Sequence, residues 1–186
     1  MHDIEINGNI LGSDFKDFHN NNLIELEDEE KEKLNISYNY KYYLPPTSKV
    51  RYFFMKKRVY TLAISVDSVN KIDQAILYIN EDNIDKYYID LVKKYGKPSS
   101  YRLSNFYLRK SGLDMKQIKQ NENKVIKSIP EPILENYKNM ENVIWDEINS
   151  DKNIIKTSLI AQNLIDPEVK NIKIFKLALI FRKNKF

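Results

Sequence analysis

Hydrophobic and polar residues alternate along residues 36–44, where isoleucine, tyrosine and leucine occupy every second position. A period of two is typical of a β-strand that buries one face. Residues 49–55 and 59–66 form two further strand-like runs, and the basic tripeptide Lys56-Lys57-Arg58 between them is expected to make a turn. Because the connections are short, the three runs predict an antiparallel meander.

A helix is predicted over residues 84–95, where apolar side chains recur at spacings of three and four. Lys93 and Lys94 fall in its last turn, where they complement the helix dipole. Gly96 can adopt the left-handed conformation that ends a helix, and Pro98 prevents its continuation. The link over residues 67–82 also carries apolar residues at helical spacing, which predicts an extra helical piece.

The remaining segments complete an α+β pattern. Residues 4–6 predict a short strand, and Ser13 can cap a short helix that carries Phe15 and Phe18. Further strands are predicted at 101–109, 142–148, 153–160 and 172–181, with a short helix at about 131–140. Together these elements predict an α+β fold with a mainly antiparallel, or mixed, sheet of about six strands and helices packed on one face.

Charge divides the chain into two parts. Residues 1–35 contain three lysines and ten acidic residues, a net charge of −7, so the rest carries +11 to give the overall +4. We therefore expect an acidic N-terminal arm over residues 1–35, with a short strand and helix, and a single basic α+β domain over residues 36–186. The mainly polar residues 111–127 predict an excursion from that domain.

Composition removes several classes of function. The chain has no cysteine and only two histidines, so it offers no disulfide, no thiolate metal site and little for a histidine site. The sequence contains no nucleophile elbow, phosphate-binding loop or dinucleotide fingerprint. No apolar run approaches the roughly 18 residues of a membrane-spanning helix. We predict no catalytic residue, no metal and no cofactor.

Several segments together resemble a known class of domain. They are Gly8-x-x-Leu11-Gly12, the run from Arg51 to Leu62, the helix end Leu91-x-x-Lys94-Tyr95-Gly96-Lys97-Pro98, and Trp145 on a later strand. Their order is similar to that of small extracytoplasmic domains of bacterial lipoproteins and envelope proteins. The resemblance implies a periplasmic or membrane-anchored location and a role in binding or assembly, while composition leaves a cytoplasmic location open. It transfers no functional residue.

The function expected from these observations is a non-enzymatic bacterial envelope protein that binds or assembles with another protein. Aromatic residues and arginine are the usual anchors of protein interfaces. The predicted contact residues lie on the meander: Tyr40, Tyr43, Tyr52, Lys56, Lys57 and Arg58. The alternative is a nucleic-acid-binding protein, because a basic sheet rich in tyrosine could also stack bases.

Overall fold

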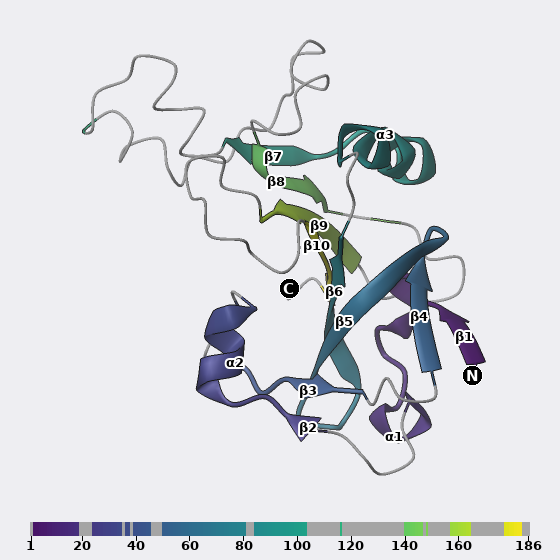
Figure 1. Ribbon diagram of the computed structural model, residues 1–186, viewed down its shortest axis with the longest axis vertical. Helices are drawn as coiled ribbons and strands as arrows, with labels where there is room; N and C mark the ends of the chain where they lie inside the picture. The colour runs from purple at the N-terminus through teal and green to yellow at the C-terminus, as the bar shows by residue number, and fades with distance from the viewer. Residues whose placement is uncertain are drawn as a thin grey trace.

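The computed structural model describes residues 2–18, 24–34, 36–37, 39–45, 50–80, 84–103, 116, 140–146, 148, 157–164 and 177–183. In chain order these residues form β1 (His2–Glu5), the 3-10 helix η1 (Gly8–Ile10), α1 (Phe15–Phe18), β2 (Ile24–Glu25), α2 (Asp28–Lys33), β3 (Tyr43–Leu44), β4 (Val50–Phe54), β5 (Lys57–Val66), β6 (Ile72–Ile79), α3 (Ile84–Tyr95), β7 (Ser100–Leu103), β8 (Met140–Trp145), β9 (Thr157–Asn163) and β10 (Leu177–Lys183). Figure 1 shows their arrangement.

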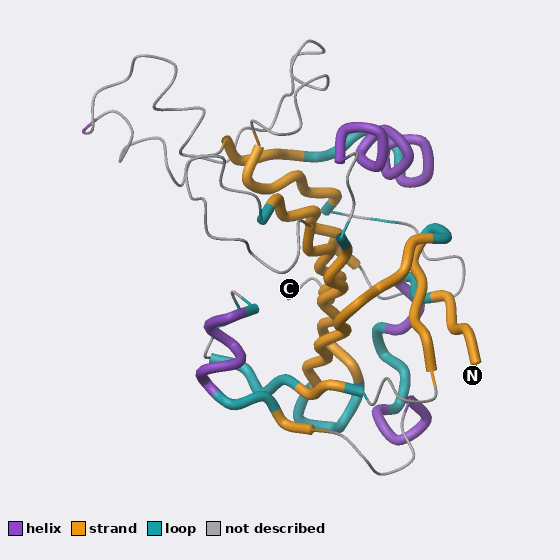
Figure 2. Tube along the Cα trace, in the orientation of Figure 1, coloured by secondary structure: helices purple, strands orange, loops and turns teal. Residues whose placement is uncertain are grey.

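The strands, drawn in orange in Figure 2, form one mixed sheet of ten. Their order is β1-β4-β5-β6-β10-β9-β8-β7, with β3 pairing β5 and β2 pairing β3 beside this path. β1 runs parallel to β4, and the other described pairs are antiparallel. The predicted α+β class with a mixed sheet is confirmed. The prediction of about six strands is wrong, because the sheet contains ten. The described helices are few.

The central strand β6 lies where the sequence predicted a helical piece, so that prediction is wrong. β6 pairs with β5 on one side and with β10 on the other. Both faces are covered, so Ala75, Ile76 and Ile79 are all buried. A strand buried on both faces carries apolar residues at nearly every position, and some of them coincide with helical spacing. Asp67, whose carboxylate accepts bonds from Val69 N and Lys71 N, makes the turn before the strand.

The predicted strand over residues 36–44 is reduced to the two residues of β3. Ile36 N–H donates to Lys31 O at 2.9 Å, so it closes the end of α2 instead of joining a strand ladder. Asn39 N–H donates to the Ser37 hydroxyl at 3.3 Å in a local turn. Ile36 and Tyr42 are nevertheless buried, whereas Tyr40 is exposed, so the alternating residues do not form one buried face of a strand.

The predicted hairpin is confirmed as β4 and β5, but its turn lies elsewhere. Phe54 pairs with Lys57, so the turn consists of Met55 and Lys56, while Lys57 and Arg58 belong to β5. Met55 and Lys56 both have positive φ, 51° and 64°, as in a type I′ turn. A register shift at Tyr60, between Val59 and Thr61, reverses the side-chain alternation near the start of β5.

Two cores lie on opposite faces of the sheet. The first core contains Leu62, Leu77 and Leu179 of the sheet with Tyr88 and Leu91 of α3. The second core contains Ala63, Tyr78 and Ala178 of the sheet with Leu26, Ile36 and Tyr42, and the partly buried Leu34 and Leu44 pack against it. α3 therefore packs on the first core, whereas residues that flank α2 pack on the second, so the structure does not place these two helices on one face as expected.

The C-terminal end of α3 follows its prediction closely. Gly96 has a φ of 80°, and its N–H donates to Val92 O at 2.8 Å. The indole N–H of Trp145 on β8 donates to Gly96 O at 2.8 Å, and its ring lies 6.0 Å from that of Tyr88. The C-terminal end of α3 is thereby fixed to β8 of the sheet.

The later strands are found at β7 to β10, within or near their predicted ranges. The polar excursion at 111–127, apart from Lys116, lies outside the described residues, as does the helix expected before Met140.

Candidate functional site

The candidate site lies on the three strands at one end of the sheet. We call it the outer face and define it as Asp3, Glu5, Arg51, Phe53, Arg58 and Tyr60. In the register of β1, β4 and β5, Asp3 pairs with Arg51, Glu5 with Phe53, and Phe53 with Arg58. Tyr52 and Val59, which lie between these positions on β4 and β5, and Ile6, which follows Glu5, belong to the first core. Because side chains alternate between the two faces of a strand, the six residues project from the opposite side.

Each arginine of the outer face lies over an aromatic ring. Arg51 Cζ is 6.0 Å from the centre of the Phe53 ring, and Arg58 Cζ is 5.2 Å from the centre of the Tyr60 ring. Arg51 also donates two hydrogen bonds to Asp3, from Nε at 2.8 Å and from Nη2 at 3.1 Å. A planar guanidinium held by two bonds has a defined orientation. The outer face therefore presents positioned cations and rings.

The β4–β5 turn borders this surface and is held from β1. Glu5 Oε1 accepts a hydrogen bond from Met55 N at 2.6 Å. Met55 is partly buried against the first core, whereas Lys56 is exposed. One carboxylate thus links the first described strand to the tip of the hairpin.

The predicted tyrosines lie in three different environments. Tyr52 is 2% exposed in the first core, and burial raises the pKa of its phenol. Tyr43 is partly buried on β3, with its ring 5.0 Å from that of Phe15. Tyr40 is exposed, and its ring meets that of Tyr42 edge-on at 6.4 Å. We leave Tyr52 out of the candidate site because a partner cannot reach it.

The predicted basic residues are all exposed: Lys56 lies in the turn, and Lys57 and Arg58 begin β5. Tyr43 pairs with Ile64 near the other end of β5. At about 3.3 Å per residue, the backbone at Ile64 lies roughly 23 Å from that at Lys57. The six predicted residues are therefore not brought together, and Arg58 alone belongs to the outer face.

Sequence reasoning missed Arg51 and Phe53 because it misplaced the turn, and it missed Tyr60 because of the bulge that follows Val59. With the turn at Met55 and Lys56, Phe53 pairs with Arg58 and both point away from the core. The hydrophobic pattern places Tyr60 with Leu62, but the bulge turns its side chain outward and leaves it 48% exposed. The alternation of Arg51 with Tyr52 was the available signal.

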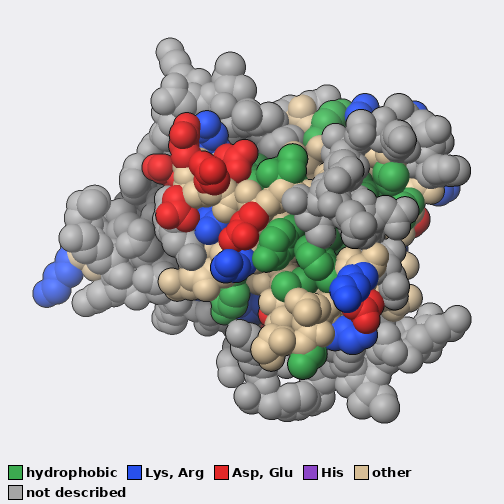
Figure 3. All heavy atoms as spheres, turned by 90° about the horizontal axis from the view of Figure 1, so that it is seen from below, with side chains coloured by type: hydrophobic (Ala, Val, Ile, Leu, Met, Phe, Trp, Pro, Cys, Tyr) green, Lys and Arg blue, Asp and Glu red, His purple; other side chains and the backbone are tan. Residues whose placement is uncertain are grey.

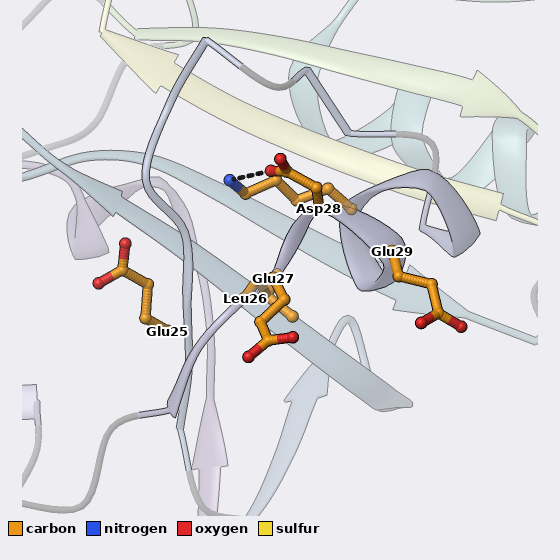
Figure 4. A pocket seen from close by; sticks show the side chains of 6 residues that line it. Glu25, Leu26, Glu27, Asp28 and Glu29 are labelled. Carbon is orange, nitrogen blue, oxygen red and sulfur yellow. Dashed lines mark hydrogen bonds and ion pairs between the residues drawn. The ribbon is translucent and has the colours of Figure 1, made fainter.

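The acidic run of the sequence lines a shallow depression formed by α2 and the residues just before it. It has a volume of about 620 Å³ and is lined by Glu25, Leu26, Glu27, Asp28, Glu29 and Lys31. Figure 3 shows acidic side chains gathered in one area of this end of the molecule. In Figure 4 the carboxylates of Glu25, Glu27 and Glu29 point away from one another, while Asp28 bonds Lys31 at 3.1 Å.

These acids stabilise the helix. Glu27 N–H donates to the Glu30 carboxylate at 3.1 Å, which satisfies a donor at the start of α2. The hydrogen bond from Lys33 lowers the pKa of Glu29. Acids in a first turn also complement the helix dipole. The side chains thus have a structural role, and they do not converge on a common ligand.

Within the described ranges, no group of three or more histidine or acidic side chains could hold a metal ion. No helix among these residues has the length and apolar character needed to cross a membrane.

No protein-family model, curated protein or solved structure matches the chain significantly.

Proposed function

We propose that the protein is a non-enzymatic binding module that holds another protein against its outer face. The observation that carries the proposal is the combination of Arg51, Phe53, Arg58 and Tyr60 on one exposed side of two adjacent strands. Arginine and aromatic residues dominate the energetics of protein interfaces, where they supply large contact areas and several hydrogen-bond donors.

The contacts within the outer face reduce the cost of binding. Asp3 fixes the Arg51 guanidinium with two hydrogen bonds, and the Tyr60 ring lies beside the Arg58 guanidinium. Ordering a mobile side chain at an interface costs about 0.5–1.5 kcal/mol. Side chains that are already ordered lose less freedom when a partner arrives, so this arrangement favours association.

The charges favour a protein partner over a nucleic acid. Asp3 and Glu5 lie on β1, beside the strand that carries Arg51, and Asp3 forms an ion pair with Arg51. A nucleic acid laid on this surface would bring phosphates close to two carboxylates, which is unfavourable. A protein partner can instead offer both signs of charge.

The bacterial envelope is the proposed location, supported by the resemblance of the hairpin and the end of α3 to domains of lipoproteins and envelope proteins. Fractionation of the source cells, followed by detection with an antibody, tests this location. Recovery in the cytoplasmic fraction would contradict it.

Site-specific photo-crosslinking tests the binding function. The photoreactive residue p-benzoylphenylalanine replaces Tyr60 in one variant and Ile89 of α3 in another. The two native side chains are 48% and 49% exposed, so they are matched controls for accessibility. We expect a discrete crosslinked protein from position 60 only, with a yield that falls about tenfold when Arg58→Glu is added.

Equal crosslinking from both positions, or none from position 60, would overturn the proposal. A gel shift of nucleic acid at low salt that Arg58→Glu abolishes would instead support the alternative function.

A further inference from the structure

The edge of the sheet next to the outer face suggests how a partner is held. β1 is the end strand in the order of the described strands and pairs only with β4 among them (Figure 1). Asp3, Ile4 and Glu5 are all exposed. An end strand with exposed side chains is the kind of element to which a further strand can be added.

The backbone of β1 has a definite orientation at this edge. Ile6 N–H donates to Phe53 O at 2.6 Å, and Ile4 pairs with Tyr52. Because the hydrogen-bonding groups of a strand alternate between its two sides, those of Ile4 and Ile6 face β4. The N–H and C=O groups of Asp3 and Glu5 therefore face the opposite side, which is the edge.

The side chains at the edge define the chemistry of an added strand. Asp3 and Glu5 project from the outer face, while Ile4 projects from the other face and is 39% exposed. A neighbouring strand would match them with two basic side chains that flank an apolar one, because opposite charges in adjacent positions stabilise strand pairs.

A second copy of β1 does not meet this requirement. Two antiparallel β1 strands centred on Ile4 would place Asp3 of one copy beside Glu5 of the other, and parallel strands would pair each acid with itself. Like charges in adjacent positions destabilise a strand pair. Charge complementarity thus favours a different chain.

We propose that β1 accepts an extended basic segment of the partner protein as an additional strand, with lysine or arginine beside Asp3 and Glu5 and an apolar residue beside Ile4. This proposal rests on the proposed function and specifies the partner's chemistry. The contacts of Asp3 with Arg51 and of Glu5 with Met55 N hold both carboxylates in place. A carboxylate has about four lone-pair sites, so each retains acceptor capacity for the added strand.

The test uses fluorescent peptides and fluorescence anisotropy. The basic probe is Lys-Val-Lys-Val-Lys, and the comparison probes are Glu-Val-Glu-Val-Glu and a basic peptide with N-methylated backbone amides. We expect the full chain to bind the basic probe at least about tenfold more tightly than either comparison peptide, because only the basic probe supplies both the charges and the backbone donors.

Two substitutions at one position separate backbone pairing from charge. Asp3→Ala and Asp3→Pro both remove the carboxylate, but only proline removes the N–H that faces the edge. We expect Asp3→Pro to bind the basic probe about tenfold more weakly than Asp3→Ala. Glu32→Ala, which removes an exposed acid of α2, should leave binding unchanged. Circular dichroism establishes that each variant is folded.

Equal binding by Asp3→Ala and Asp3→Pro, or equal binding of the acidic probe, would overturn the strand-addition proposal. If the peptides fail while crosslinking from position 60 persists, the strand addition is wrong and the binding function stands. Loss of both results would reject the proposed function as well.

Discussion

Trp145 shows how one residue joins distant parts of this chain. Its ring packs against Tyr88 of α3, and its indole N–H bonds the carbonyl of Gly96 just beyond that helix. The residue is 2% exposed, so its polar atom needs a protein partner. The Gly96 carbonyl supplies that partner and also fixes the position of the helix end.

We expect Trp145→Phe to lower the free energy of unfolding by about 1–3 kcal/mol, because it removes this hydrogen bond and leaves a gap beside Tyr88. Urea unfolding followed by circular dichroism measures the change. Ile89→Ala, on the exposed side of α3, should stay within about 0.5 kcal/mol of the wild type. If Trp145→Phe left the free energy of unfolding unchanged, the hydrogen bond to Gly96 would contribute nothing to stability.

Prediction of single residues from the sequence is limited because neighbouring residues of a strand face opposite sides of the sheet. Tyr52 and Phe53 are adjacent rings of similar character, yet one is in the core and the other on the outer face. A shift of one residue in a hairpin exchanges the faces of every side chain beyond it. The sequence shows that the rings are on strands, but the turn and the bulge decide which of them a partner can reach.

At the scale of elements, the β4–β5 turn is an informative case. Met55 and Lys56 adopt positive φ values that are favourable for glycine and asparagine but cost other residues roughly 1 kcal/mol or more each. The Glu5 carboxylate and the contact of Met55 with the first core offset part of that cost.

We predict that Lys56→Gly raises the free energy of unfolding by about 0.5–1 kcal/mol, since glycine adopts the turn conformation without strain. Lys57→Gly is the matched control, because Lys57 lies in the extended conformation of β5 and glycine should destabilise it there. Thermal unfolding of the two variants measures the difference. A lower melting temperature for Lys56→Gly would contradict the prediction.

Elements with local signals are the ones that the sequence predicts. α3 has apolar periodicity, a terminal glycine and a following proline, and the hairpin has two strand-like runs with a short link. The sequence of β6 carries no comparable local signal for a strand. It is a strand because β5 and β10 flank it, and β10 lies about 100 residues further along the chain.

At the scale of the whole molecule, buried tyrosines give the protein a specific response to alkali. Burial raises the pKa of Tyr42 to about 12, with Asp73 adding to the effect. Burial likewise raises the pKa of Tyr52, Tyr78, Tyr88 and Tyr95 above the ordinary value. These residues belong to both cores or pack against them, so the response involves the entire fold.

The sign of the pH dependence follows from the raised pKa values. An unfolded tyrosine ionises near pH 10, whereas the folded residues keep their protons to higher pH. The stability they contribute is therefore complete below about pH 10 and declines as the pH rises through the folded values. We expect urea midpoints to fall between about pH 9 and about pH 11, and to fall less for Tyr42→Phe. Equal declines in the two proteins would contradict this assignment.

The size of the sheet was the least predictable property of the fold. The sequence indicates an α+β domain and several strands, but β1 and β2 are short and lack a long alternating pattern, and β3 is only the end of a longer alternating run. β1 is placed by its pairing with β4, β3 by its pairing with β5, and β2 by its pairing with β3. The two cores likewise follow from packing between segments that no local pattern connects.

The position of β10 also governs the order in which the sheet can be assembled. It follows every other described strand in the chain, yet it lies between β6 and β9. During synthesis, the group β1–β6 and the group β7–β9 can form their own pairs before β10 leaves the ribosome. Until then, β6 and β9 each present an unpaired edge, and such edges are prone to aggregation. The pairing of β10 with β6 and β9 is therefore completed late. Interruption of synthesis before residue 177 would leave two incomplete sheets.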